Sequence, residues 1–414
     1  MNILSLFKTR DGKIIVENFL SLSFLQVVTM ILPLITLPYI IRVIGYEKFG
    51  LIALASSLVM YFQSLVDYSF KITAVRDLSL NRRYPKRVSL IYSRVMLIKF
   101  ILLILALTLL SFIVYIYPPF YVEKELFFYT SLSLIGGVLF PEWFFQGIEK
   151  MRYITIINAC IKVIFSLSVF VFIQESGDYL LIPFLTSSGL IVSGIVGQVY
   201  LHKNFRVGFV IIPIRSLIKA IKNNFYIFIN QFVPNLYNNS TSFLLGVFAG
   251  NEALGVYSAI LKIIDLCIVL LNVVSRVFFP FNNRNKSSFL VYKKIIFLLA
   301  FFGVTALLLV HDVIFFYLDL ENYLALPLLI ITGLSIFGYV LYDVFGLNYF
   351  IVNKNDKLVM KNTLFSSIFS FLLAFPLIAS FGVIGAACTL LIGRLLMGGV
   401  LAGLYMKDKV CFGK

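Results

Sequence analysis

The sequence predicts an all-α integral membrane protein with about twelve transmembrane helices, arranged as two parallel-repeat six-helix bundles around a central cavity. Three observations lead to this fold class. Of the 414 residues, 60% are hydrophobic and only 13% are charged, and the mean hydropathy is +0.98, so lipid must solvate most of the chain. Lys and Arg residues gather in alternate loops. The two halves of the chain repeat each other.

Twelve apolar stretches are long enough for a helix to cross the hydrocarbon core, which takes about 20 residues. The first follows a charged leader and has no small-residue cleavage site, so we expect a retained helix and not a removed signal peptide. The spans cover approximately residues 19–44, 49–70, 95–117, 124–146, 154–174, 180–201, 225–249, 253–277, 294–318, 322–349, 358–380 and 382–405.

The orientation of these spans follows from the positions of Lys and Arg. With the N-terminus in the cytoplasm, cytoplasmic segments hold 27 of the 35 Lys and Arg residues, external segments hold three, and five lie inside spans. This bias satisfies the positive-inside rule and places both termini in the cytoplasm. Topology and anionic lipid therefore explain the net charge of +16, and no nucleic-acid partner is needed.

A six-residue pattern occurs twice, as GYEKFG at 45–50 and as GNEALG at 250–255. The offset of 205 residues aligns each span with the sixth span after it. Because six is an even number, both halves start on the same side of the membrane and form parallel repeats. We expect an N-terminal bundle (1–201), a cytoplasmic connecting segment (202–224), a C-terminal bundle (225–406) and a cytoplasmic tail (407–414). Two such bundles, rocking about a shared cavity, indicate a transporter.

Charged side chains inside the spans are candidates for substrate binding, because burying them in lipid is costly. Lys162, Lys262 and Arg394 outnumber Asp265 among the deepest groups, with Asp343 nearer the inner side. If they face the cavity, it is positive and suits an anionic substrate such as a lipid-linked phosphate. Lys262 and Asp265 are three residues apart and can pair, either as a functional site or as an internal ion bridge.

Three further cations lie near the ends of predicted spans. Lys99 and Arg276 are close to the cytoplasmic ends, where we expect their side chains to reach back to the membrane interface. Arg42 ends the first span on the outer side, just before GYEKFG. It is either a gate contact or an interfacial anchor.

The seventh span is unusually polar. Its amides are candidate sugar contacts in the cavity, or else they form helix-to-helix hydrogen bonds. Prolines in the first span of each half make these helices prone to kink, which serves either a gate or irregular packing. The amides are Asn230, Gln231, Asn235 and Asn238, and the prolines are Pro33, Pro38 and Pro234.

Other classes of chemistry have no support in the sequence. There is no phosphate-binding loop of the G-x-x-x-x-G-K-[ST] type, so we expect no nucleotide hydrolysis. The four cysteines lack paired or metal-binding spacing and the two histidines are isolated, so we predict neither a metal site nor a cofactor. The external loops are short and bring together no acid, base and nucleophile, so we do not expect an enzyme.

Three stretches resemble a known family: LPYIIRVIGYEKFGLIALASSLVMYFQSLVDYSF, PEWFFQGIEKMRYITIINACIKVI and GNEALGVYSAILKIIDL. They resemble the first helix pair, the inner loop after the fourth helix, and the turn between the seventh and eighth helices of the O-antigen flippases (Wzx type). This is a polysaccharide transporter family of the multidrug/oligosaccharidyl-lipid/polysaccharide exporter superfamily.

The resemblance implies a multi-pass protein of the bacterial inner membrane that flips undecaprenyl-diphosphate-linked O-antigen units from the cytoplasmic to the periplasmic leaflet by alternating access. In some members an ion or proton gradient drives the step, and the O-antigen polymerase and chain-length regulator act on the product. Arg42, Lys262, Asp265 and Arg394 lie at matching motifs or spans and are the implied functional residues.

Two alternatives remain open at this point. A multidrug exporter of the same superfamily shares the repeat, but it usually has an anionic cavity for cationic drugs. An O-antigen polymerase has similar size and hydropathy, but it typically carries long external loops rich in Arg and His, which this sequence lacks.

Overall fold

A computed structural model describes residues 10–205, 207–284, 286–320 and 324–412 of the chain. In these ranges all regular secondary structure is helical, with no strand, as the sequence predicts. The helices are α2 (Arg10–Asp67), α3 (Phe70–Asn81), α4 (Pro85–Ile116), α5 (Pro118–Val122), α6 (Lys124–Leu139), α7 (Glu142–Gly147), α8 (Met151–Phe172), the 3-10 helix η1 (Ser176–Leu180), α9 (Leu181–Phe205), α10 (Ile214–Ala249), α11 (Asn251–Arg284), α12 (Lys286–Leu309), α13 (His311–Leu318), α14 (Ala325–Leu341), the π-helix η2 (Tyr342–Ile351) and α15 (Asp356–Phe412).

Nine helices in the described ranges are long and apolar enough to cross a membrane. Two of these nine are 55 and 52 residues long, and a straight helix of that length would measure about 80 Å, more than twice the hydrocarbon thickness. Each is broken by a glycine with positive φ, at Gly45 in α2 and at Gly382 in α15. Each therefore holds two crossings, and with α10 the total of twelve crossings stays our expectation.

Element boundaries differ from the predicted spans where polar residues continue a helix. Helix α4 begins at Pro85, ten residues before the predicted start, because proline suits the first turn of a helix and the charged residues after it need no lipid. The predicted ninth span is divided at Val310 into α12 and α13.

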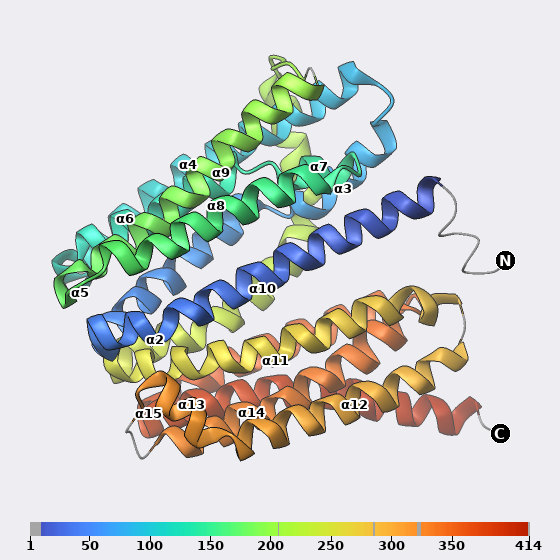
Figure 1. Ribbon diagram of the computed structural model, residues 1–414. Coiled ribbons are helices and arrows are strands. Elements are labelled where there is room, and N and C mark those ends of the chain that lie inside the picture. Colours follow the sequence, from blue (N-terminus) through green and yellow to red (C-terminus); the bar gives the residue numbers. More distant parts are fainter. Residues whose placement is uncertain (1–9, 206, 285, 321–323, 413–414) are drawn as a thin grey trace. The chain divides into compact units, whose positions relative to one another are not determined.

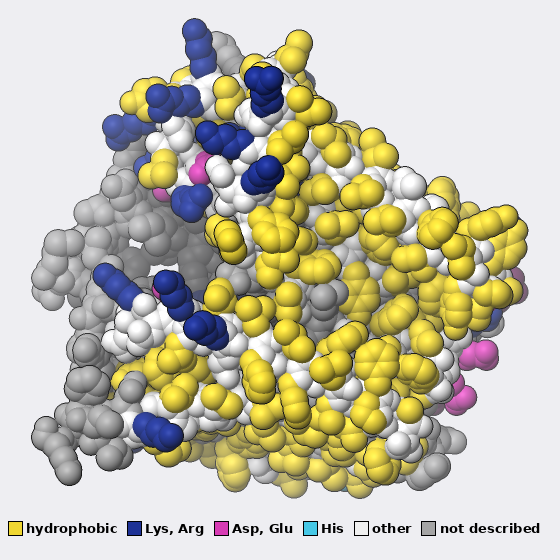
Figure 2. Space-filling model, turned by 180° about the vertical axis from the view of Figure 1, so that it is seen from behind, with side chains coloured by type: hydrophobic (Ala, Val, Ile, Leu, Met, Phe, Trp, Pro, Cys, Tyr) yellow, Lys and Arg dark blue, Asp and Glu magenta, His cyan; other side chains and the backbone are white. Residues whose placement is uncertain are grey.

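Contacts group the chain into two compact units. Unit 1 comprises residues 1–36 and 58–232, and unit 2 comprises residues 37–57 and 233–414. Residues 37–57, which join the first two predicted spans, thus group with the C-terminal half. Figure 1 shows the long helices running side by side in bundles, and on the face in Figure 2 hydrophobic side chains cover the middle of the helices while Lys and Arg gather toward one end.

Glycines set the closest helix packing within each unit. In unit 1, a Cβ added at Gly136 of α6 would lie 2.6 Å from Leu190 Cβ of α9. In unit 2, a Cβ added at Gly338 of α14 would lie 2.7 Å from the main-chain carbon of Arg394 in α15. Small residues let helices approach in this way in membranes, and the second contact positions Arg394.

Candidate functional site

The repeated G-x-E-x-x-G pattern forms the same structure twice. Its first glycines, Gly45 and Gly250, have φ of +76° and +92°, a left-handed backbone that glycine adopts without steric cost. Each is followed by the first turn of a membrane helix, which carries an exposed glutamate, Glu47 or Glu252. A carboxylate there is favourable beside the positive end of the helix dipole. The first glycine therefore turns the chain and the glutamate starts the next helix.

The second glycines bring the two copies into reciprocal contact within unit 2. A Cβ added at Gly50 would lie 1.7 Å from the carbonyl oxygen of Asn251, and one added at Gly255 would lie 2.1 Å from that of Tyr46. Residues 46 and 251, like 50 and 255, are 205 positions apart, so the same contact is made in both directions. Only glycine allows this approach of one backbone to the other. We call it the glycine crossing. It explains why the pattern recurs.

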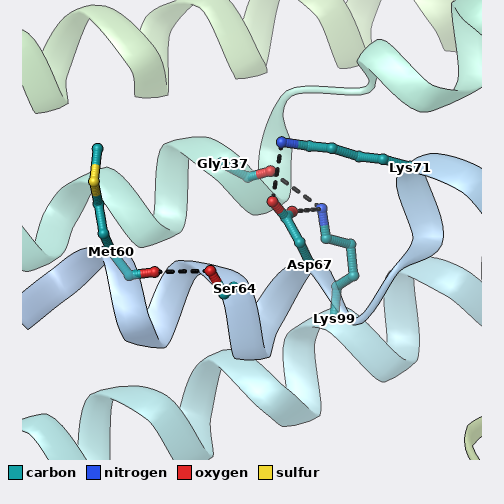
Figure 3. A network of polar contacts seen from close by, with 6 residues as sticks. All are labelled: Met60, Ser64, Asp67, Lys71, Lys99 and Gly137. Carbon is teal, nitrogen blue, oxygen red and sulfur yellow. Dashed lines mark hydrogen bonds and ion pairs between the residues drawn. The ribbon is translucent and has the colours of Figure 1, made fainter. Parts of the chain in front are cut away.

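A charge cluster built around the buried side chain of Lys99 occupies unit 1 (Figure 3). Asp67, at the end of α2, lies between two lysines: its Oδ1 is 3.0 Å from Lys99 Nζ and its Oδ2 is 3.0 Å from Lys71 Nζ. Lys99 also donates to the Gly137 carbonyl oxygen at 3.3 Å. Its side chain is only 2% exposed.

The expectation that Lys99 reaches the membrane interface is therefore wrong. Asp67 and the Gly137 carbonyl oxygen satisfy its ammonium group inside the bundle, so the side chain has no need to extend to water. The sequence did carry a signal, because Asp67 is an acidic residue at the predicted cytoplasmic end of a span, where basic residues are expected.

Predicted site residue Lys162 belongs to the same unit. It is partly buried on α8 and interacts electrostatically with Glu142 of α7 and with Lys71, and Glu142 also interacts with Lys71. The unit 1 cluster thus comprises three cations and two carboxylates: Lys71, Lys99, Lys162, Asp67 and Glu142. It holds one excess positive charge.

Unit 2 brings together three of the predicted site residues. Asp265 on α11 interacts electrostatically most with Arg394 of α15 and next with Lys262. Arg394 Nη1 also donates to Ser335 Oγ of α14 at 2.8 Å. The pairing of Lys262 with Asp265 stays a prediction, and Arg394 is the cation with the larger electrostatic effect on Asp265.

Two more charged residues join this cluster through Tyr339. Its ring hydroxyl donates to Asn272 Oδ1, and it interacts electrostatically with Asp343, Arg394 and Arg276. The unit 2 cluster therefore comprises Lys262, Arg276, Arg394, Asp265 and Asp343, again three cations and two carboxylates.

Asp343 itself lies in a polar network that the sequence did not predict. Ser275 and Tyr292 donate to its two carboxylate oxygens, and Asn348 Nδ2 donates to Ser275 Oγ at 3.0 Å and to the Asp343 carbonyl oxygen at 3.1 Å. Asp343 and Asn348 lie on the π-helix η2, a form of helix often found at functional sites. The network fixes this irregular helix against α11 and α12.

The remaining predicted residues are placed as follows. Arg42 is exposed and Gln231 is half-buried. Pro33 and Pro38 lie in α2, whose break is at Gly45, so their role as kinks stays a prediction. Four side chains lie outside the described residues although their helix is described: Asn230, Pro234, Asn235 and Asn238.

Comparison with known proteins shows which family the chain belongs to. The family model described as "Polysaccharide biosynthesis protein" matches residues 15–286, about two thirds of the chain. The chain belongs to this family. A protein of Escherichia coli (strain K12) named "Putative O-antigen transporter" is 25% identical over 405 residues, covering 95% of this chain and 97% of that protein.

Two solved structures share the fold. One is titled "Lipid II flippase MurJ, inward closed conformation", with a TM-score of 0.73, 16% identity, and coverage of 92% of this chain and 87% of that one. The other is an inward-facing multidrug resistance MATE family transporter of the MOP superfamily, with a TM-score of 0.64, 14% identity, and coverage of 94% and 98%. The chain is therefore a multi-pass membrane protein with a transporter fold.

Proposed function

We propose that this protein is a flippase of the bacterial inner membrane, which moves undecaprenyl-diphosphate-linked O-antigen units from the cytoplasmic to the periplasmic leaflet. Three findings support the proposal: the polysaccharide biosynthesis family, the name of the full-length relative, and the fold shared with a protein titled a lipid flippase.

The observation that carries the proposal is the charge of the membrane-embedded cluster of unit 2. In unit 2 the cluster has three cations and two carboxylates within the predicted spans, so one positive charge is in excess there. The unit 1 cluster has its excess only through Lys71, which lies just after the second predicted span and is 58% exposed. A diphosphate is the part of a lipid-linked sugar that such cations recognise, and arginine can bind it with two parallel hydrogen bonds. A multidrug exporter for cationic drugs would need the opposite excess. We assign Arg394 and Lys262 to the diphosphate.

Alternating access supplies the mechanism. The glycine crossing holds the external end closed while the substrate enters from the cytoplasmic leaflet, and it parts to release the substrate outside. We further propose that an ion or proton gradient drives net transport, as the family resemblance implies for some members. O-antigen polymerase and its chain-length regulator then act on the delivered unit.

Deleting the gene in its host tests this function. We expect loss of long-chain surface polysaccharide and single lipid-linked units trapped on the cytoplasmic leaflet. Arg394→Ala and Lys262→Ala should each reduce surface polysaccharide at unchanged protein level. Lys357→Ala, which removes an exposed cation of α15 outside the cluster, should leave it unchanged. Surface polysaccharide at the wild-type level in both cluster variants would contradict the proposal that Arg394 and Lys262 bind the substrate.

A further inference from the structure

The segment that joins the two repeats is fixed to unit 1. The Gly208 N–H donates to Ser89 Oγ at 3.2 Å and the Val210 N–H donates to Ser93 Oγ at 2.8 Å, both on α4. The side chain of Ile212 is buried. These contacts hold the segment across the start of α4.

Helix α10 continues this segment, and its inner face is also fixed. The ring of Tyr68 stacks on Phe228 with 4.5 Å between the centroids, and its hydroxyl donates to the Ile221 carbonyl oxygen at 3.2 Å. Leu217, on the same face, is buried. The opposite side of the first turns of α10 must therefore point away from unit 1.

Beside the buried face of α10, turned from it by about 60° around the helix, runs a stripe of exposed apolar side chains. Ile211 is 95% exposed, and Ile214 and Ile218 are 71% and 47% exposed, followed by Phe225 at 48%. At 100° per residue, positions 214, 218 and 225 lie within about 40° of one another on the helix. Isoleucine side chains this exposed favour an apolar environment such as lipid. These three lie before residue 225, where the seventh predicted span begins.

A stripe of cations lies beside the apolar one. Arg215, Lys219 and Lys222 are all exposed, and the same helical geometry places them together, turned by roughly 80–140° from Ile214. Between Asp178 and Glu252 the sequence contains no Asp or Glu, so no carboxylate of this region neutralises them. We call residues Ile211, Ile214, Arg215, Ile218, Lys219 and Lys222 the connector surface.

We propose that the connector surface binds anionic phospholipids of the cytoplasmic leaflet, with their phosphates on the three cations and their acyl chains on the isoleucines. An apolar stripe next to a basic stripe is the pattern of a helix in the membrane interface. The length of α10 fits this position: its 36 residues measure about 54 Å, whereas the hydrocarbon core takes about 30 Å. The inference does not depend on what the protein transports.

Lipid binding by the purified full-length protein tests the proposal. Fluorescently labelled phosphatidylglycerol in neutral micelles is the probe, and anisotropy reports binding at low salt. A cation near an anionic lipid contributes about fivefold in affinity, so the variant Arg215→Gln/Lys219→Gln/Lys222→Gln should bind on the order of 100-fold more weakly. High salt should weaken binding by the wild-type protein.

Two controls separate binding at the connector surface from a general effect of charge. Lys354→Gln/Lys357→Gln/Lys361→Gln removes the same charge from three other exposed positions and should change binding by less than about twofold. Labelled phosphatidylcholine should bind the wild-type protein weakly. Equal losses in the two triple variants, unchanged binding in the first, or equal binding of both lipids would each overturn the proposal. Ile214→Ser/Ile218→Ser, with the cations intact, should also weaken binding, and wild-type affinity there would overturn the role of the apolar stripe.

Discussion

The glycine crossing makes a sharp prediction for Gly50→Ala. The added Cβ would lie 1.7 Å from the Asn251 carbonyl oxygen, 2.6 Å from its carbon and 2.7 Å from the Gly255 nitrogen. All three are backbone atoms, so no side-chain rotation can relieve the clash. Because ordinary contact begins near 3.4 Å, the two backbones must separate by about 1.7 Å.

The energetic effect follows from this displacement. Overpacking costs about 1–3 kcal/mol where neighbours can adjust, and a clash with rigid backbone belongs at the upper limit. A destabilisation of about 3 kcal/mol changes the equilibrium between closed and parted crossing on the order of 100-fold. Gly255→Ala should act similarly through Tyr46. The double variant Gly50→Ala/Gly255→Ala should lose less stability than the sum of the two single variants, because both substitutions break the same contact.

Accessibility measures the opening. Ser57 is a buried position about two helical turns after Gly50 in α2. Ser57→Cys is introduced into a variant whose four cysteines are replaced by serine, and labelled with a membrane-impermeant maleimide from outside the cell. Gly50→Ala should raise the labelling rate at least tenfold and lower surface polysaccharide. Gly303→Ala is the matched control, because nothing lies within 4 Å of its added Cβ. Wild-type labelling, melting temperature and polysaccharide in Gly50→Ala would refute the reasoning.

Three other substitutions follow from the polar networks and the turn. Lys99→Met leaves Asp67 paired with Lys71 alone and removes a charged hydrogen bond, so it should destabilise the purified protein by about 1.5–3 kcal/mol in thermal unfolding. Lys99→Met/Asp67→Asn should recover part of the loss, and no recovery would argue against the pair. Asp343→Ala strands the hydroxyls that donate to it and should lower the melting temperature more than Asp343→Asn; equal effects would contradict the network. Gly45→Ala meets no atom within 4 Å and should cost only the strain of a backbone with φ of +76° and ψ of 168°, about 1–3 kcal/mol. A larger loss of stability than in Gly50→Ala would contradict the assignment of Gly45 to the turn and of Gly50 to the close contact.

Sequence reasoning identified the membrane helices and the repeat because both depend on local patterns. Hydropathy marks each crossing, and the 205-residue offset aligns GYEKFG with GNEALG. The contact of Gly50 with Asn251 was beyond reach, since a repeat shows that two segments are alike and not that they touch. For the same reason, the sequence did not predict that residues 37–57 group with unit 2.

The charged residues show a similar limit. Lys162, Lys262, Asp265 and Arg394 were selected by the cost of burying charge, and the last three do interact in unit 2. Lys99 was misjudged because its depth was estimated from its own helix alone, whereas its partner Asp67 lies on another. Which helix supplies a counter-charge depends on tertiary packing, which hydropathy does not encode.

Reconstitution tests the central claim most directly. The purified protein is placed in proteoliposomes with undecaprenyl-diphosphate-linked oligosaccharide, and the fraction of sugar exposed on each leaflet is followed in time with an imposed ion or proton gradient. The account predicts transfer between leaflets by the wild-type protein and strongly reduced transfer by Arg394→Ala at equal reconstitution. Absence of transfer by the folded wild-type protein under every gradient, or equal transfer by Arg394→Ala, would contradict it.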